Sequence, residues 1–361
     1  MQKLVIIQPY LTEYRLPVFN ELGKDFIICL ISSSPERIGT FGDPRIDGTR
    51  IRKQYLLQEQ QFFNGKLLFQ SGVIAVLRKE NPDVVLSVSN PRYLNFWLAL
   101  FYCRIKNIPF FTWGHGLFKK KEPSVLSRFV FRIMVKFSKK YICYTSAVQN
   151  SLKNLGIPDW KIPIAENSLI FDFPVTPSER SGDELGVLFI GRLRPHSEIP
   201  KLIKAVEKLR NKTRTNVILH VVGDGEEGPT LQKEFGDYNW IIWYGEIYNQ
   251  QKVAEISKKC FCGCYPGSAG LSILHMMSLS LPPVIHGSLY LHGPESSYIS
   301  DNVNGLLFSL EAPEDSIQKC LFFLLTNKAR RKEMQELAFS TYKKISEPNL
   351  GERLKRILIG W

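Results

Sequence analysis

Short apolar segments alternate with helical patterns along this chain, and the alternation occurs twice, which constrains the fold more than any other feature. The first series of predicted strands covers residues 4–7, 26–31, 84–88, 109–113 and 140–144. The second series covers residues 187–190, 217–222, 241–244, 260–265 and 283–285. Buried strands that alternate with helices are typical of a parallel sheet covered by helices. We therefore predict an α/β fold with two doubly wound domains.

The chain length and a polar segment between the two series place the domains. The 361 residues exceed the roughly 250–300 that one hydrophobic core can serve. Residues 174–183 are rich in proline, serine and glycine, and they predict an interdomain linker. We expect the domains over 1–173 and 185–344. Open α/β sheets bind ligands at the carboxyl ends of their strands, so a binding cleft is expected between the two domains.

A glycine-rich turn lies between a predicted strand and a predicted helix in the second half. The turn consists of Gly267, Ser268, Ala269, Gly270 and Leu271. Its glycines allow backbone N–H groups to approach a ligand, and the following helix directs its positive end at the turn, which suits a phosphate or diphosphate. His275 lies about one helical turn later, where its imidazole can reach the same ligand or serve as an ordinary core histidine. His286 and His292 flank a loop, and we expect them at the surface.

The formal charge of +13 implies an anionic partner such as nucleic acid, an acidic membrane or a phosphorylated substrate. Nucleic acid is disfavoured, because no nucleic-acid motif is present and the charge is spread through the chain. The first residues are strand-like rather than a signal peptide, and residues 96–103 are too short an apolar run to span a bilayer. We expect a cytoplasmic or peripheral membrane protein whose alternating Cys260, Cys262 and Cys264 are buried reduced thiols.

A basic stripe is predicted on the helix that follows residue 124. Arg128, Arg132, Lys136 and Lys140 recur every four residues, and three lysines at 119–121 precede them. Beside aromatic residues, such a stripe predicts contact with an anionic membrane surface. An ordinary core helix with a solvated charged face is an equally good interpretation of this pattern.

Five segments of the second half resemble, in the same order, motifs of the retaining GT-B glycosyltransferases of family four. They are Phe189–Leu193, Val222–Gly225, Tyr244–Ile247, Pro266–His275, and Gly293–Glu295 with Asn302–Phe308. The resemblance is firm over 185–330 and weaker in the first half, where Tyr14-Arg15, Gly114-His115-Gly116 and Asn167–Leu169 carry it. It implies a GT-B fold of two Rossmann-like domains, with residues 345–361 returning to the first domain.

The resemblance also implies an activity. A hexose or related sugar would move from a nucleotide diphosphate to a glycan or lipid-linked glycan with retention, as in bacterial polysaccharide, lipopolysaccharide or capsule assembly. Arg192 supplies a charged fork for phosphate oxygens, His115 resembles the residue that contacts the transferred sugar, and His275 would hold the ribose. The other implied donor contacts are Gly191, Ser197, Gly245, Glu246, the turn from Gly267 to Leu271, and Glu295. Tyr14 and Arg15 are the candidate acceptor contacts. No D-x-D motif occurs, so we expect neither a metal nor another cofactor.

The chain departs from the family pattern at three positions. Gly267 and His275 stand where the E-x7-E segment has its two glutamates, and Ser197 stands where a phosphate lysine is expected. A non-catalytic GT-B partner protein therefore remains an alternative, as does another GT-B nucleotide-sugar enzyme such as an epimerase. Glu295 has a second interpretation as the cap of the helix that follows it.

Overall fold

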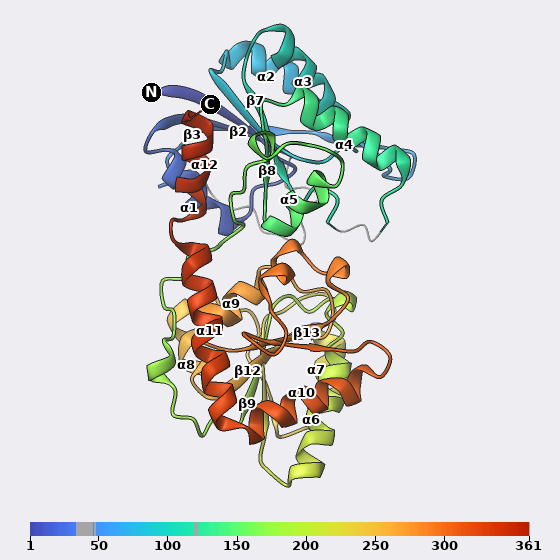
Figure 1. The fold of residues 1–361 in the computed structure, drawn as a ribbon, viewed down its shortest axis with the longest axis vertical. Coiled ribbons are helices and arrows are strands. Elements are labelled where there is room, and N and C mark those ends of the chain that lie inside the picture. Colours follow the sequence, from blue (N-terminus) through green and yellow to red (C-terminus); the bar gives the residue numbers. More distant parts are fainter. Residues whose placement is uncertain (34–45, 47, 119–121, 361) are drawn as a thin grey trace. The chain divides into compact units, whose positions relative to one another are not determined.

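A computed structural model describes residues 1–33, 46, 48–118 and 122–360 (Figure 1). The chain divides into two compact units, Met1–Asn167 with Pro348–Trp361, and Ser168–Glu347. Each unit contains a six-stranded parallel sheet with helices packed on it. The predicted pair of doubly wound α/β domains is confirmed.

In the first unit the sheet order is β3-β2-β1-β6-β7-β8, so the strand order reverses between β1 and β6. Its strands and helices are β1 (Gln2–Ile7), α1 (Leu16–Leu22), β2 (Phe26–Ser33), β3 (Ile51–Leu57), β4 (Glu59–Phe62), β5 (Leu67–Gln70), α2 (Val73–Glu80), β6 (Val84–Val88), α3 (Leu94–Ile105), β7 (Phe110–Gly114), α4 (Val125–Phe137), β8 (Tyr141–Cys143), α5 (Ser146–Lys153) and α12 (Leu350–Ile359). Helices α4 and α5 begin after Ser124 and Thr145, whose hydroxyls accept a hydrogen bond from the first helical turn.

The last helix, α12, belongs to the core of the first unit. Its apolar residues Leu350, Leu354 and Leu358 recur every four positions and are buried with the residues of β1 and β2. Gly351 permits close packing on α1, because a Cβ there would lie 2.5 Å from the Cβ of Glu21. The chain thus returns to its first half after completing the second unit.

In the second unit the sheet order is β11-β10-β9-β12-β13-β14, with the reversal between β9 and β12. The elements are β9 (Gly186–Ile190), α6 (Ile199–Thr213), β10 (Ile218–Val222), α7 (Gly228–Phe235), β11 (Ile241–Trp243), α8 (Gln250–Ser257), β12 (Cys260–Cys264), α9 (Ser272–Ser278), β13 (Pro283–His286), β14 (Leu306–Phe308), α10 (Pro313–Thr326) and α11 (Lys328–Ser346). Strands β9 and β12 are buried along their whole length, which explains their continuous apolar sequences.

The segment 174–183 differs from the predicted interdomain linker, because it lies inside the second unit. Val175 is buried and its N–H donates to the carbonyl of Ser278. The Arg180 guanidinium donates to the carbonyls of Ser257, Cys260 and Leu279, and burial lowers its pKa to about 10. The Arg180 side chain of this segment therefore binds carbonyl groups at the ends of neighbouring elements.

Candidate functional site

The loops that follow β9 and β10 pack backbone against backbone at the carboxyl edge of the second sheet. Gly223 has a φ of 134°, and a Cβ there would lie 1.9 Å from the carbonyl oxygen of Gly191. A Cβ on Gly225 would lie 2.3 Å from the carbonyl oxygen of Leu193. Only glycine permits this approach, so these residues fix the position of the loop that carries Arg192.

Arg192 is half-buried in that loop, one residue beyond the φ of 152° at Gly191. The buried Ser197 hydroxyl donates to the Arg192 carbonyl and accepts a hydrogen bond from the Arg194 N–H at 3.1 Å. It also lies 3.3 Å from the Tyr265 hydroxyl. The Ser197 hydroxyl thus shapes the loop, and its predicted contact with the donor stays a prediction.

The glycine turn after β12 lies against the 3-10 helix Pro195–Ser197. A Cβ on Gly267 would lie 1.8 Å from the carbonyl oxygen of His196, so this backbone arrangement has no room for a side chain. The Ser268 N–H donates to that same carbonyl at 2.9 Å, and the Ser268 hydroxyl donates to the Leu291 carbonyl. The loops after β9 and β12, which flank the strand-order reversal, thus form one connected structure.

His292 supports the turn from within the protein, and the sequence interpretation missed this role. Its ring is fully buried and stacks on the ring of His286 at 3.7 Å, so the expectation that both histidines lie at the surface is wrong. The Ala269 N–H donates to Nδ1 of His292 at 3.0 Å. The proton therefore resides on Nε2, which donates to the His286 carbonyl at 3.0 Å.

The second half of the turn does not use its N–H groups internally. Ser268 and Ala269 use theirs internally, which reduces the number that the sequence led us to expect. No acceptor in the described part of the chain binds the N–H of Gly270 or Leu271. Helix α9 begins at Ser272, directly after these two residues. These donors at the helix start remain suited to an anionic group.

His275 is half-buried on α9, and its ring stacks on that of Phe171 at 4.2 Å. Burial lowers its pKa to about 4, so the imidazole is neutral near pH 7. Among the described residues, none hydrogen-bonds to its ring nitrogens. A neutral ring held by stacking can exchange hydrogen bonds with hydroxyl groups, as the ribose role requires.

The other predicted donor contacts of the second unit have distinct environments. Glu295 is buried in the 3-10 helix Pro294–Tyr298, with a carboxylate oxygen behind Gly270 and Gly293. The Glu295 carboxylate therefore packs against the glycine turn. Gly245 has a φ of 66°, and its carbonyl accepts from the Gly223 N–H, whereas Glu246 is exposed at the end of β11.

In the first unit, the predicted sugar contact His115 is exposed in a tight turn after β7. Gly116 has a φ of 55°, and its N–H donates to the Tyr141 hydroxyl at 2.9 Å. A Cβ on Gly114 would lie 2.6 Å from the Cβ of Ser89. The His115 ring contacts the edge of the Tyr144 ring at 5.0 Å. Gly114 thus leaves room for the Ser89 side chain and Gly116 adopts a positive φ, and the turn they form holds His115 at the carboxyl edge of the sheet.

Arg15 lies among aromatic rings at the same edge. Its guanidinium lies 4.2 Å from the centre of the Trp113 ring, 5.2 Å from that of Tyr14 and 5.6 Å from that of Tyr144. It donates one hydrogen bond, to the Tyr144 hydroxyl at 3.4 Å. Arg15 is buried, yet no carboxylate of the described residues lies within 4 Å of it. Such a cation is suited to an anionic ligand group.

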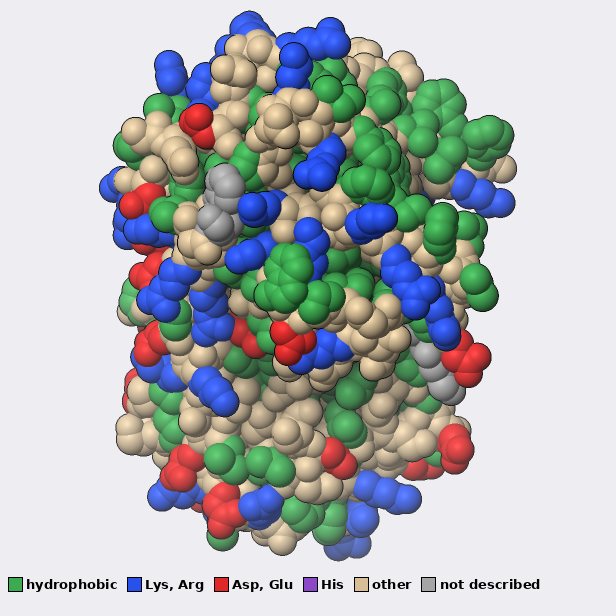
Figure 2. All heavy atoms as spheres, turned by 45° about the horizontal axis from the view of Figure 1, so that its top comes forward, with side chains coloured by type: hydrophobic (Ala, Val, Ile, Leu, Met, Phe, Trp, Pro, Cys, Tyr) green, Lys and Arg blue, Asp and Glu red, His purple; other side chains and the backbone are tan. Residues whose placement is uncertain are grey.

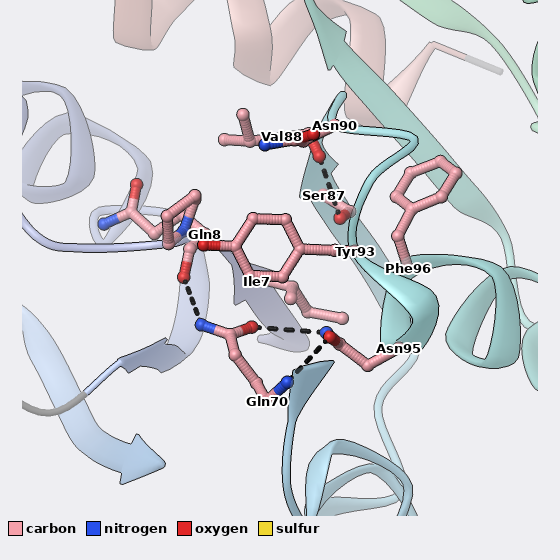
Figure 3. Close-up of a pocket in the computed structure, with 10 residues that line it drawn as sticks. Ile7, Gln8, Gln70, Ser87, Val88, Asn90, Tyr93, Asn95 and Phe96 are labelled. Atoms are coloured by element: carbon pink, nitrogen blue, oxygen red, sulfur yellow. Dashed lines mark hydrogen bonds between the residues drawn. The ribbon is translucent and has the colours of Figure 1, made fainter. Parts of the chain in front are cut away.

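A small pocket lies at the strand-order reversal of the first sheet (Figure 3). It is lined by the ends of β1 and β6 and by the residues Gln70, Tyr93 and Asn95. Gln70 and Asn95 exchange hydrogen bonds, and Gln70 also donates to the carbonyl of Gln8 (Figure 3). The Tyr93 hydroxyl donates to Glu59 at 2.6 Å. The sequence signal for this pocket was weak, because its amides come from four separate segments.

The basic stripe is placed as follows. Arg128, Arg132 and Lys136 are exposed on α4, and Lys140 is half-buried beyond its end. The predicted contribution of residues 119–121 lies outside the described residues. Over the described ranges, no helix has the length and apolar character needed to cross a membrane, and no three His, Cys, Asp or Glu side chains are placed to hold a metal ion.

Two family models match the chain, one in each unit. Residues 176–340 match "Glycosyl transferases group 1", and residues 22–169 match "Glycosyltransferase Family 4". Together the two models cover most of the chain, so each unit is similar to a glycosyltransferase domain. A curated relative, an uncharacterized glycosyltransferase of Methanocaldococcus jannaschii, is 25% identical over 225 residues, which are 60% of this chain and 56% of the relative. This alignment thus spans little more than half the length of that relative.

Solved GT-B structures share the whole fold. The chain is similar to Anabaena HepE, solved with UDP, at a TM-score of 0.72 and 14% identity, with all of both chains covered. It is similar to the lipopolysaccharide outer core galactosyltransferase WaaB at a TM-score of 0.68 and 15% identity, with 99% of each chain covered. For WaaG, a glycosyltransferase of lipopolysaccharide biosynthesis, the TM-score is 0.63 and the identity 13%, with 99% of this chain and 100% of WaaG covered.

Proposed function

We propose that this glycosyltransferase transfers a hexose or related sugar from a nucleotide diphosphate to a glycan or lipid-linked glycan, with retention and without a metal. The observation that carries the proposal is the pairing of Arg192 with the turn at Gly270 and Leu271. These follow the neighbouring strands β9 and β12, at the strand-order reversal where open α/β sheets bind ligands. The UDP bound to HepE supports a uridine donor.

In the proposed reaction the bond between the anomeric carbon and the diphosphate oxygen breaks. An acceptor oxygen then bonds to that carbon from the same face, and its proton passes to the leaving phosphate. Arg192 and the turn N–H groups stabilise the charge that develops on the diphosphate. His275 holds the ribose, and Gly245 with Glu246 adjoins the base.

The first unit supplies the remaining contacts. His115 binds the transferred sugar, and Arg15 with Tyr14 and the pocket at Gln70 and Asn95 binds the acceptor. Carboxamides and aromatic rings suit sugar hydroxyls, and the caged Arg15 suits a phosphate or carboxylate of the acceptor. We place the protein in the cytoplasm, with peripheral membrane attachment through the stripe at Arg128, Arg132, Lys136 and Lys140.

A thermal-shift screen with UDP-, GDP-, ADP- and dTDP-sugars tests the donor site. One of them should raise the melting temperature, since a ligand that binds only the folded state stabilises it. Arg192→Ala should weaken that ligand about 10- to 100-fold, the loss of a charge-assisted phosphate contact. Lys233→Ala, an exposed residue of α7, is the matched control and should have no effect. The donor assignment is wrong if no nucleotide sugar shifts the melting temperature.

A non-catalytic partner protein is the second candidate, and the geometry at Gly267 favours it. The close approach of the His196 carbonyl leaves no room for the carboxylate that the family carries there. Transfer and donor-hydrolysis assays separate the two functions. Binding of a nucleotide sugar without turnover on any acceptor supports the partner role, whereas turnover that persists in EDTA supports the metal-independent enzyme.

A further inference from the structure

The positive charge of this chain is concentrated in one stretch of the first unit. Residues 84–158 contain twelve lysines and arginines and a single acidic residue, Glu122. Their formal charge is +11, against +13 for the whole chain. The prediction that the positive charge is spread through the chain is therefore wrong. This stretch includes α3 and α4, neither of which contains an Asp or Glu.

Helix α3 exposes a stripe of apolar side chains. Leu94, Leu98, Phe101 and Ile105 follow one another at intervals of three and four residues, so they lie on one face of the helix. All four are exposed, and Ile105 at the end of the helix is 78% exposed. The opposite face, with Phe96 and Leu100, is buried in the core. The stripe is therefore additional to the face that α3 needs for packing.

Helix α4 packs beside α3 and exposes apolar side chains of its own. Val125, Leu126 and Phe129 are 83%, 70% and 58% exposed in its first turns. The rings of Phe101 on α3 and Phe137 on α4 are in edge contact at 5.5 Å, which links the two helices. We call the seven exposed apolar residues of α3 and α4 the apolar face. In Figure 2, hydrophobic side chains gather at the upper right with Lys and Arg side chains around them.

The cations that border the apolar face form no ion pair with another described residue. Arg128, Arg132 and Lys136 lie on α4, and Arg104 and Lys106 lie at the end of α3, all of them exposed. Arg128 and Arg132 donate to the carbonyls of Pro123 and Leu155, and no carboxylate of the described residues lies within 4 Å of either. Their charge is therefore available to an external anionic surface.

We infer that the apolar face enters the headgroup region of an anionic phospholipid bilayer, while the bordering cations bind the lipid headgroups. This inference rests on the membrane attachment in the proposed function and names the surface that performs it. Exposed apolar residues flanked by Lys and Arg are the pattern of helices that lie in a membrane interface. A second copy of the chain fits poorly, because self-association through this face would bring two strongly positive surfaces together.

Vesicle sedimentation tests the inference with three proteins. The wild type should pellet with phosphatidylglycerol-containing vesicles and stay in solution with phosphatidylcholine vesicles. R128Q/R132Q/K136Q should weaken binding about a hundredfold, since each cation contributes about fivefold. I105S/L126S/F129S should weaken vesicle binding at least about tenfold. At about 1 M salt, where charges are screened beyond about 3 Å, the wild type and the cation variant should keep a residual binding that this variant lacks.

Matched variants in the second unit control for charge and for exposed apolar area. K212Q/K233Q/K332Q removes three exposed cations, and V303S/L310S/L337S removes three exposed apolar side chains. Both should bind vesicles like the wild type. All variants should keep the thermal shift with nucleotide sugar, which shows that they are folded. That shift also separates this inference from the donor assignment, since either can fail alone.

Three results overturn the inference. One is a wild type that does not pellet with anionic vesicles, and another is equal binding to neutral and anionic vesicles. The third is a dimer of the wild type, in sedimentation velocity without lipid, that I105S/L126S/F129S converts to a monomer. The last result assigns the apolar face to a second copy of the chain.

Discussion

Replacement of His292 by alanine should lower the stability of the second unit and weaken nucleotide binding at the proposed donor site. The ring accepts a hydrogen bond from the Ala269 N–H and donates one to the His286 carbonyl, both at 3.0 Å. His292→Ala leaves both backbone groups buried without a partner, at about 1–3 kcal/mol each. We expect a loss of about 4 kcal/mol, which lowers the melting temperature of a unit of this size by roughly 8–16 °C.

Two further variants separate the two hydrogen bonds of His292. In His292→Asn the side-chain oxygen can still accept from the Ala269 N–H, and in His292→Gln the amide can still donate to the His286 carbonyl. Asn should therefore preserve nucleotide affinity better than Gln, because it keeps the bond that holds the glycine turn. His196→Ala is the control, since only its backbone carbonyl contacts the turn and its side chain is exposed.

Urea unfolding followed by tryptophan fluorescence measures stability, and titration with the nucleotide sugar found in the thermal-shift screen measures affinity. If His292→Ala melts like the wild type and binds the nucleotide equally well, the role of His292 as the support of the turn is refuted. A loss of stability with unchanged affinity would show that Ala269 is not part of the donor site.

Three more predictions concern the second unit. Burial lowers the pKa of three histidines to about 4. Between pH 6.5 and pH 4 the unfolded chain therefore binds protons that the folded chain does not. As the pH is lowered through this range, the free energy of unfolding should fall by about 1.4 kcal/mol per pH unit for each histidine. These residues are His220, His275 and His286. A flat profile in urea unfolding over this range would contradict the burial of these rings. Arg331→Met should lower the free energy of unfolding by about 3–5 kcal/mol in the same assay, because it leaves the buried carboxylate of Glu184, 3.3 Å from Arg331, without its cation. The double variant with Glu184→Leu should recover most of this loss, and no recovery would refute the pairing. Gly223→Ala should abolish nucleotide binding and lower the melting temperature, because the new Cβ collides with the Gly191 carbonyl; wild-type affinity in thermal-shift titration would show that the two loops can separate without consequence.

The candidate site was predicted in part, and the reasons differ from residue to residue. Gly223 and Gly267 are visible in the sequence as glycines, but the backbone carbonyls that require them belong to another loop. The hydrogen bonds of the Ser197 hydroxyl inside the loop were not predicted, because a motif position does not show which groups a hydroxyl meets. His292 carried no sequence signal, since its two partners lie 6 and 23 residues away.

The sequence by itself determined the two parallel sheets, the order of their strands along the chain and the positions of the glycine turns. These depend on hydrophobic periodicity and on backbone conformations that glycine favours, and both are local properties. Only the tertiary structure decided which backbone N–H groups of the turn remain for a ligand, that Arg15 lies buried among three rings, and that α3 has a second, exposed apolar face. Each of these depends on contacts between residues that lie far apart in the sequence, and no local sequence pattern specifies such contacts.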